Sequence, residues 1–185
     1  MAQTIAPHFE NILQSLVYLL KNEPFLKETG EAKTLRDWLV QDGAIADLTI
    51  TIGFPASLDQ IDLPALALVP GVLRPTVDLA YNEVVKDYSL TLTIFGFAGG
   101  YAEDHQNTRQ QHRLMNEVKL LLEQAEFFPI YGLAPSGALD TAVTLNQGEI
   151  RQVTARTIPV TGLGVSQRFR FALDVEVTML RALHT

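Results

Sequence analysis

The sequence predicts a single α+β domain in which a mixed, largely antiparallel sheet is packed by two main helices. Two stretches show helical spacing of apolar residues, and stretches of alternating apolar residues cluster between and after them. Clustered strands favour an α+β arrangement over a doubly wound sheet, in which strands and helices alternate strictly. We expect residues 1–185 to form one domain, because this length suits one core and no linker or repeat divides the chain.

The composition narrows the possible classes of protein. The chain has 14 basic and 21 acidic residues, for a net charge of −7, whereas free-standing nucleic-acid binders are usually basic. It has no cysteine, which excludes disulfides, thiolate metal sites and cysteine nucleophiles. The N-terminal stretch lacks the basic region of a signal peptide, and no stretch approaches the roughly 20 apolar residues that span a bilayer. We therefore expect a soluble protein made in the cytoplasm.

Two helices are predicted near the N-terminus. Apolar side chains recur at steps of three and four residues, which predicts a helix from about Pro7 to Lys21. Pro24 follows and cannot continue the helix. The stretch "KTLRDWLVQDG" predicts a short second helix that ends at Gly43, with Trp38 as a packing anchor.

Three strands are predicted next. "DLTITI" alternates apolar and polar residues. "LPALALVPG" is apolar on both faces, which predicts a short central strand with Pro64 and Pro70 at its ends. "YSLTLTI" alternates again and places Leu90, Leu92 and Ile94 on the inner face.

The clearest strand pattern lies in "VSQRFRFALDVEVTML" near the C-terminus. Apolar residues from Val165 to Met179 share one face, and charged or hydroxyl residues share the other. This alternation is typical of an antiparallel or edge strand with one buried and one solvated face. Two turns, at Asn146–Glu149 and Thr161–Gly164, predict successive hairpins before it.

A glycine-rich bend after "SLTLTIFGF" invites comparison with a phosphate-binding loop. A P-loop requires a lysine directly after its last glycine, but here the next lysine is Lys119. Glu103 and Asp104 would also repel phosphate at the helix start. We interpret the stretch as a structural bend. The following helix has an apolar stripe that begins at Leu114, whereas 103–113 contains no apolar residue and predicts a solvated face or a contact outside the subunit.

Catalytic and metal-binding patterns fail on spacing. His105 and His112 lie seven residues apart, about 10 Å along a helix, which is too far for one metal ion. Ser136 lacks the first glycine of a nucleophile elbow. Asp174 and Glu176 could act as an acid–base pair, but neighbouring basic residues favour charge pairing across strands. We expect no enzyme activity, no cofactor and no metal site.

The order of elements resembles the tail terminator (tail-completion or neck) proteins of tailed bacteriophages. The resemblance rests on an amphipathic first helix, then "LPALALVPG", "DYSLTLTIFGF", a polar bend, the helix "HRLMNEVKLLLEQA" and final strands, and it covers roughly Pro7 to Leu180. It implies a virion structural protein that forms a ring, expected to be hexameric, at the head-proximal end of the tail tube. The ring would end tube polymerisation and join the tail to the head.

The resemblance also implies partners. These are further copies of the chain, the tail tube protein and the head–tail connector or stopper protein, and it allows a contact with a sheath protein. DNA would pass through an acidic lumen without specific binding, because like charges repel. Three alternatives stay open: another head–tail joining or tail-tube-like subunit, a cellular non-enzymatic binding domain, and an enzyme with an unrecognised site.

The sequence departs from the resemblance in one segment, which is longer than a compact subunit needs. We expect residues 127–151 to form an added loop and hairpin that reaches a neighbour or the tube. Ring contacts are heterologous, so different surfaces of neighbouring subunits meet. The candidate subunit or partner contacts are Glu103, Asp104, Arg109, Arg113, Tyr131, Leu133, Arg151, Arg168, Arg170, Asp174 and Glu176.

Overall fold

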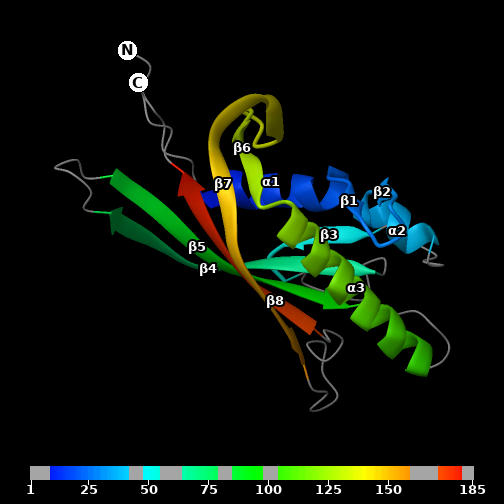
Figure 1. The fold of residues 1–185 in the computed structure, drawn as a ribbon. Helices are drawn as coiled ribbons and strands as arrows, with labels where there is room; N and C mark the ends of the chain where they lie inside the picture. The colour runs from blue at the N-terminus through cyan, green and yellow to red at the C-terminus, as the bar shows by residue number, and fades with distance from the viewer. Residues whose placement is uncertain are drawn as a thin grey trace.

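The computed structural model describes residues 9–41, 48–54, 64–78, 85–97, 104–158 and 171–180. Helices and strands follow one another as α1 (Phe9–Asn22), β1 (Phe25–Leu26), β2 (Ala32–Lys33), α2 (Leu35–Gln41), β3 (Thr49–Ile52), β4 (Ala65–Asp78), β5 (Val85–Phe97), α3 (Asp104–Gln124), β6 (Phe127–Leu133), β7 (Leu139–Thr157) and β8 (Phe171–Leu180). The predicted α+β class is confirmed (Figure 1).

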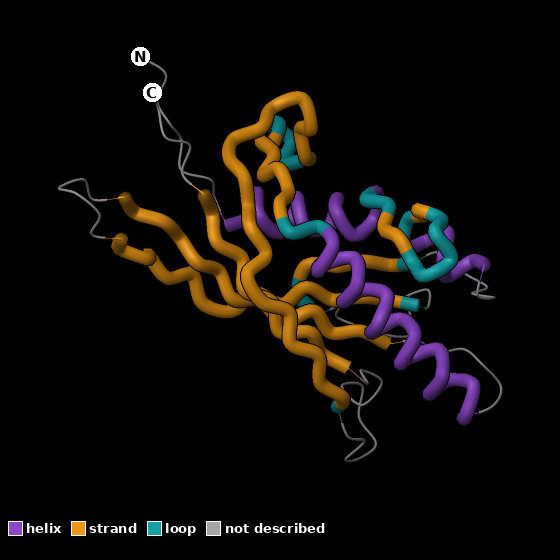
Figure 2. Tube along the Cα trace, viewed as in Figure 1, coloured by secondary structure: helices purple, strands orange, loops and turns teal. Residues whose placement is uncertain are grey.

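A six-stranded sheet forms the centre of the fold, in the order β3-β4-β5-β8-β7-β6. β3 runs parallel to β4, and every other neighbouring pair is antiparallel, so the sheet is mixed and largely antiparallel as predicted. β1 and β2 make a separate two-stranded sheet. The helices gather on one side of the strands (Figure 2).

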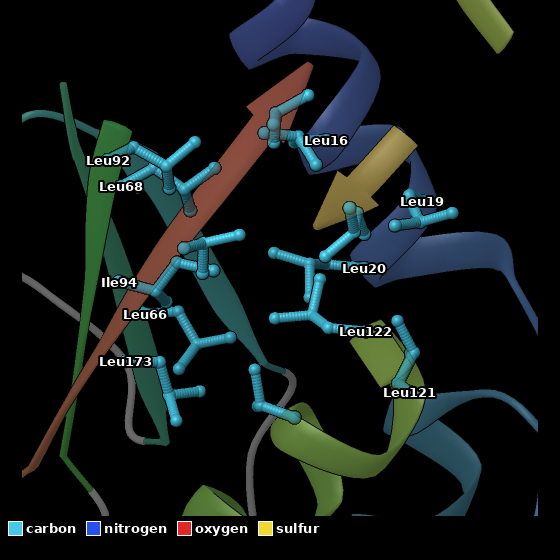
Figure 3. Packing of buried hydrophobic residues seen from close by; sticks show 14 of the residues in the cluster. Leu16, Leu19, Leu20, Leu66, Leu68, Leu92, Ile94, Leu121, Leu122 and Leu173 are labelled. Atoms are coloured by element: carbon cyan, nitrogen blue, oxygen red, sulfur yellow. The ribbon is translucent and has the colours of Figure 1, made fainter. Parts of the chain in front are cut away.

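The hydrophobic core lies between this sheet and the helices. Leu16 and Leu20 of α1 and Leu122 of α3 face the inner residues of the sheet (Figure 3). Leu19 of α1 and Leu121 of α3 belong to the same buried cluster. Full burial of one such side chain stabilises the fold by about 1.5–3 kcal/mol. α1 ends at Asn22, two residues before the expected stop at Pro24.

β8 follows the predicted alternation throughout its described length. Phe171, Leu173, Val175, Val177 and Met179 are all buried, at 3% exposure or less. The strand lies between β5 and β7 in the interior of the sheet, so it is antiparallel but not an edge strand. The neighbouring strands β5 and β7 turn the same face toward the core, which explains why β8 shows the clearest alternation of apolar and polar residues.

β4 corrects the prediction of a short strand that ends at Pro70. The strand continues through Pro70 to Asp78, with a bulge between Pro70 and Leu73. β3 pairs with β4 only as far as Leu68, so the rest of β4 has β5 as its single partner among the described strands, and an edge strand tolerates proline. At the bulge, the Val72 amide donates to the Thr91 hydroxyl oxygen at 3.1 Å.

The predicted turn at Asn146–Glu149 is also wrong, because these residues continue β7. Gly148 pairs with Phe128 and Met179 on the neighbouring strands, and a Cβ at Gly148 would lie 2.7 Å from the Phe128 ring. This glycine therefore makes room for an aromatic ring and does not turn the chain. The β6–β7 turn lies at 134–138, where Gly137 has φ +82°. The other predicted turn, Thr161–Gly164, lies outside the described residues.

The segment 127–151, which we expected to be an added loop and hairpin, makes β6 and most of β7. These strands form an antiparallel hairpin that belongs to the main sheet. Its core-facing side chains Phe128 and Ile130 are buried. The hairpin is therefore part of the structural framework of the domain.

Trp38 anchors the small unit made by β1, β2 and α2, as predicted. Its ring is buried, and its Nε1 donates to the Phe25 carbonyl at 3.4 Å. The ammonium groups of Lys27 and Lys33 lie 4.2 and 4.9 Å from the ring centroid, a cation–π arrangement. Lys27 also forms an ion pair with Glu117 of α3, which ties this unit to the third helix. α2 ends at Gln41, and the predicted stop at Gly43 lies outside the described residues.

Replacing Gly96 of β5 with alanine should destabilise the fold. The new Cβ would lie 2.0 Å from Cζ of Phe171, which is buried in the neighbouring strand, so strands or ring must shift. Overpacking of this kind costs about 1–3 kcal/mol, measurable by urea unfolding. In a double-mutant cycle, Phe171→Leu should recover part of the loss caused by Gly96→Ala. Strictly additive losses would contradict this steric explanation.

Candidate functional site

The face of the sheet that points away from the helices is the candidate functional site. We call it the open face and define it by Thr91 and Thr93 of β5, Gln152 and Thr154 of β7, and Asp174 and Glu176 of β8. These residues are half-buried or exposed, and together with Gly71 they line a hollow of about 340 Å³. Strand alternation creates this face, because the intervening residues of β5 and β8 are buried against the helices. No described helix covers it.

Hydrogen bonds across strands hold the two carboxylates of the open face. Asp174 accepts from the Thr93 hydroxyl at 2.7 Å and from Nε of Arg156 at 2.9 Å. Glu176 accepts from the Ser89 hydroxyl at 2.7 Å. The predicted charge pairing across neighbouring strands is therefore confirmed for Asp174, with Arg156 as the partner. The carboxylates act as cross-strand links, each with its own partners.

The charge state of Asp174 follows from these contacts. The hydrogen bond from Arg156 is the main cause that lowers the pKa of Asp174 below its ordinary value of 3.8, and the Thr93 hydroxyl acts in the same direction. Partial burial opposes them but is outweighed. The open face therefore keeps this negative charge at neutral pH.

Apolar side chains flank the hydroxyl- and carboxylate-rich hollow. Val72, next to Gly71 at the β4 bulge, is 52% exposed. Along β5, Phe95 contacts Phe54 with a ring-centroid distance of 4.9 Å, and Phe54 is 55% exposed. A polar centre with exposed apolar groups beside it is a surface chemistry that suits protein contacts.

The β6 edge of the sheet is closed by α1. The Tyr131 amide donates to the Ser15 hydroxyl at 2.9 Å, and the Tyr131 carbonyl accepts from Nδ2 of Asn11 at 2.9 Å. Asn11 and Ser15 are almost fully buried. These two side chains occupy a backbone donor and acceptor with which another strand would pair, so they protect the edge from strand addition.

The structure separates the predicted contact residues into several places. Asp174 and Glu176 lie together on the open face, and Arg109 and Arg113 are exposed on α3. Arg151 forms an ion pair with Glu149 at 2.9 Å. Asp104 is the first residue of α3. Glu103, Arg168 and Arg170 lie outside the described residues.

Tyr131 and Leu133 are half-buried on the edge strand β6. The Tyr131 ring packs edge-on against Tyr18 with centroids 5.4 Å apart, so its aromatic surface already has a partner within the subunit. Burial is the main cause that raises the pKa of Tyr131, and Tyr18 and Glu23 add to it. The phenol therefore stays neutral at physiological pH.

The polar start of α3 needs one correction. We expected nothing in 103–113 to be buried in the subunit, yet Gln111 is only 8% exposed. Arg109, His112 and Arg113 are exposed, as a solvated face requires. The periodicity of a helix explains both facts, because Gln111 lies three and seven residues before the buried Leu114 and Val118 and shares their side.

Sequence reasoning missed Asn11 and Ser15. The available indication was a pair of polar residues four apart on the apolar face of the first helix, a position where a polar side chain needs a buried partner. It also missed Thr91, Thr93, Gln152 and Thr154, because their proximity depends on the strand order.

Of the glycine-rich bend, the structure describes only its start. Gly96 belongs to β5, where its lack of a side chain accommodates Phe171, and residues 98–103 lie outside the described part of the chain. Within the described residues, no three His, Asp or Glu side chains gather closely enough to hold a metal ion. None of the described helices combines the length and apolar character needed to cross a membrane.

Comparison with protein-family models and with curated proteins gave no match to this chain.

Removing the amide of Asn11 should destabilise the protein by about 1–3 kcal/mol, because the Tyr131 carbonyl loses its buried partner. The measurement is urea unfolding of Asn11→Ala. The matched control is Asn22→Ala, which also removes an amide that donates to a carbonyl at 2.9 Å, but at an exposed site. Equal losses in the two variants would contradict a role for Asn11 in closing the β6 edge.

Asp174 should contribute a pH-dependent part of the stability. Because its pKa is lower in the folded state, this contribution is present above the ordinary value of 3.8 and is lost as pH falls through the folded value. The difference in unfolding free energy between wild type and Asp174→Asn should be constant above roughly pH 5 and shrink below it. If the difference in unfolding free energy between wild type and Asp174→Asn is the same at about pH 3 and about pH 6, ionisation of Asp174 contributes nothing to the stability.

Proposed function

We propose that the protein is a structural subunit of a bacteriophage virion, a tail terminator that forms a ring at the head-proximal end of the tail tube. The observation that carries the proposal is the open face, a six-stranded sheet surface that no described helix covers, opposite a face packed by α1 and α3. The order of helices and strands along the chain supports the same assignment.

A ring requires two different surfaces on each subunit. In a heterologous assembly, one surface of a subunit contacts another surface of the next, and the ring closes when the rotation permits. The helical layer and the open face point in opposite directions and differ in chemistry. The helical layer and the polar open face are therefore two different surfaces through which neighbouring subunits of a ring could contact each other.

The β4–β5 hairpin supplies a further contact. The two strands pair from Ala65–Phe97 to Asp78–Val85, and their distal ends extend beyond the helices (Figure 1). Proline at two positions and a bulge mark the distal half of β4, features that prevent indiscriminate strand addition. An arm of this kind suits a specific contact with a neighbouring subunit or with the end of the tube.

The proposed role depends on binding surfaces and needs no catalytic step. The ring would cover the terminal tube subunits, prevent further addition and present its other side to the head connector. An acidic lumen would let DNA pass, because like charges repel. Another head–tail joining subunit would use the same surfaces on a different partner.

The assembly state tests this proposal. Size-exclusion chromatography with light scattering, over a wide concentration range, should show a discrete oligomer with about six times the 20.5 kDa mass of the chain. Negative-stain imaging of that fraction should show closed rings with a central hole.

A monomer at every concentration would contradict the proposal as stated and favour a cellular binding domain. Rings that fail to cap added tail tubes would indicate a different head–tail joining role.

A further inference from the structure

A stripe of exposed side chains runs along α3 on the side away from its buried residues. We call it the α3 stripe, and it consists of Arg109, His112, Arg113 and Asn116. Steps of three and four residues place these side chains on one helix face, while Leu114, Val118 and Leu121 occupy the face that packs in the core. The charged side chains of the stripe are both arginines, although the whole chain is acidic.

The hollow on the open face has charge of the opposite sign. Its charged lining residues are Asp174 and Glu176. Arg156 already pairs with Asp174, whereas Glu176 accepts one hydrogen bond, from Ser89, and has no basic partner among the described residues. A carboxylate offers about four lone-pair sites, so Glu176 retains the capacity to bind a guanidinium, which forms two parallel hydrogen bonds in the favourable case.

The α3 stripe and the open face of one subunit cannot meet each other. α3 lies over β5, β7 and β8 on the helical side of the sheet, and its stripe points further outward, whereas the open face lies on the opposite side. A contact between these two surfaces therefore requires two copies of the chain. Such a contact is heterologous and repeats from one copy to the next.

We propose that the α3 stripe of one copy docks on the open face of the next, with its guanidinium groups against Glu176 and the hydroxyls around it. Thr91, Thr93 and Thr154 line the hollow and offer acceptors for the remaining N–H groups. A helix placed there covers a sheet face that the subunit leaves uncovered, which is the usual solution for a sheet in a layered fold. This inference rests on the proposed function and names the contact that builds the ring.

Charge reversal tests the contact in the full chain. Arg109→Glu/Arg113→Glu should weaken self-association by about 100-fold, because like charges would then meet across the interface. Glu176→Lys alone should weaken it in the same way. Combining Glu176→Lys with both arginine reversals restores opposite charges and should recover most of the association. Light scattering over a concentration series measures the oligomer fraction.

A matched control changes the same charge elsewhere. Lys21→Glu/Arg36→Glu alters two exposed basic residues on α1 and α2, far along the chain from the stripe, and should leave association unchanged. All the altered side chains apart from the half-buried Glu176 are exposed, so circular dichroism should show folded variants. If a reversal variant unfolds, the neutral Arg109→Gln/Arg113→Gln pair replaces it and should weaken association to a smaller degree.

The outcomes separate this inference from the proposed function. Rings that form equally well from wild type and from the reversal variants overturn the contact and leave the ring standing. Reversal-sensitive dimers or open chains in place of rings support the contact and contradict a tail terminator. A wild-type chain that stays monomeric overturns both.

Discussion

The alternation of side chains along β8 constrains most of the structure. Because β8 lies between β5 and β7, its odd-numbered residues from Phe171 to Met179 define the face that α1 and α3 must cover. The same alternation places Asp174 and Glu176 on the other face. An apolar layer over that face would bury the two carboxylates away from water, which is energetically costly. One strand pattern therefore determines both where the core lies and which surface is left for contacts.

The two edges of the sheet are protected from strand addition in different ways. Polar side chains of α1 occupy backbone groups of β6, so that edge is closed within the subunit. The distal half of β4 relies on proline and a bulge, and it projects with β5 as a hairpin. In the proposed ring, contacts between copies would use the open face and the projecting hairpin, because the β6 edge is already occupied by α1.

Local pattern was sufficient to predict the helices, the β5 and β8 alternation and the α+β class, because each depends on periodicity over a few residues. Local pattern was insufficient where the role of a residue depends on a contact that is distant in the sequence. In the sequence, Gly148 has the pattern of a turn residue, but in the structure it makes room for the Phe128 ring. Pro70 has the pattern of a strand end, but β4 continues through it because β3 pairs with β4 only as far as Leu68. The candidate site was predicted in part, since Asp174 and Glu176 share a strand, whereas Thr91 and Gln152 join them only through the order of strands.

The central claim is that the open face of the sheet meets another protein subunit. Since the chain has no cysteine, a single Gln152→Cys thiol on this face can be labelled with a maleimide in dilute and in concentrated protein, with Arg36→Cys on α2 as the control. Gln152 pairs with Glu176 across the strands and is exposed in the isolated subunit. We predict that labelling at residue 152 slows markedly on concentration while labelling at residue 36 does not. Equal labelling of residue 152 at both concentrations, in a sample that has assembled, would contradict the claim.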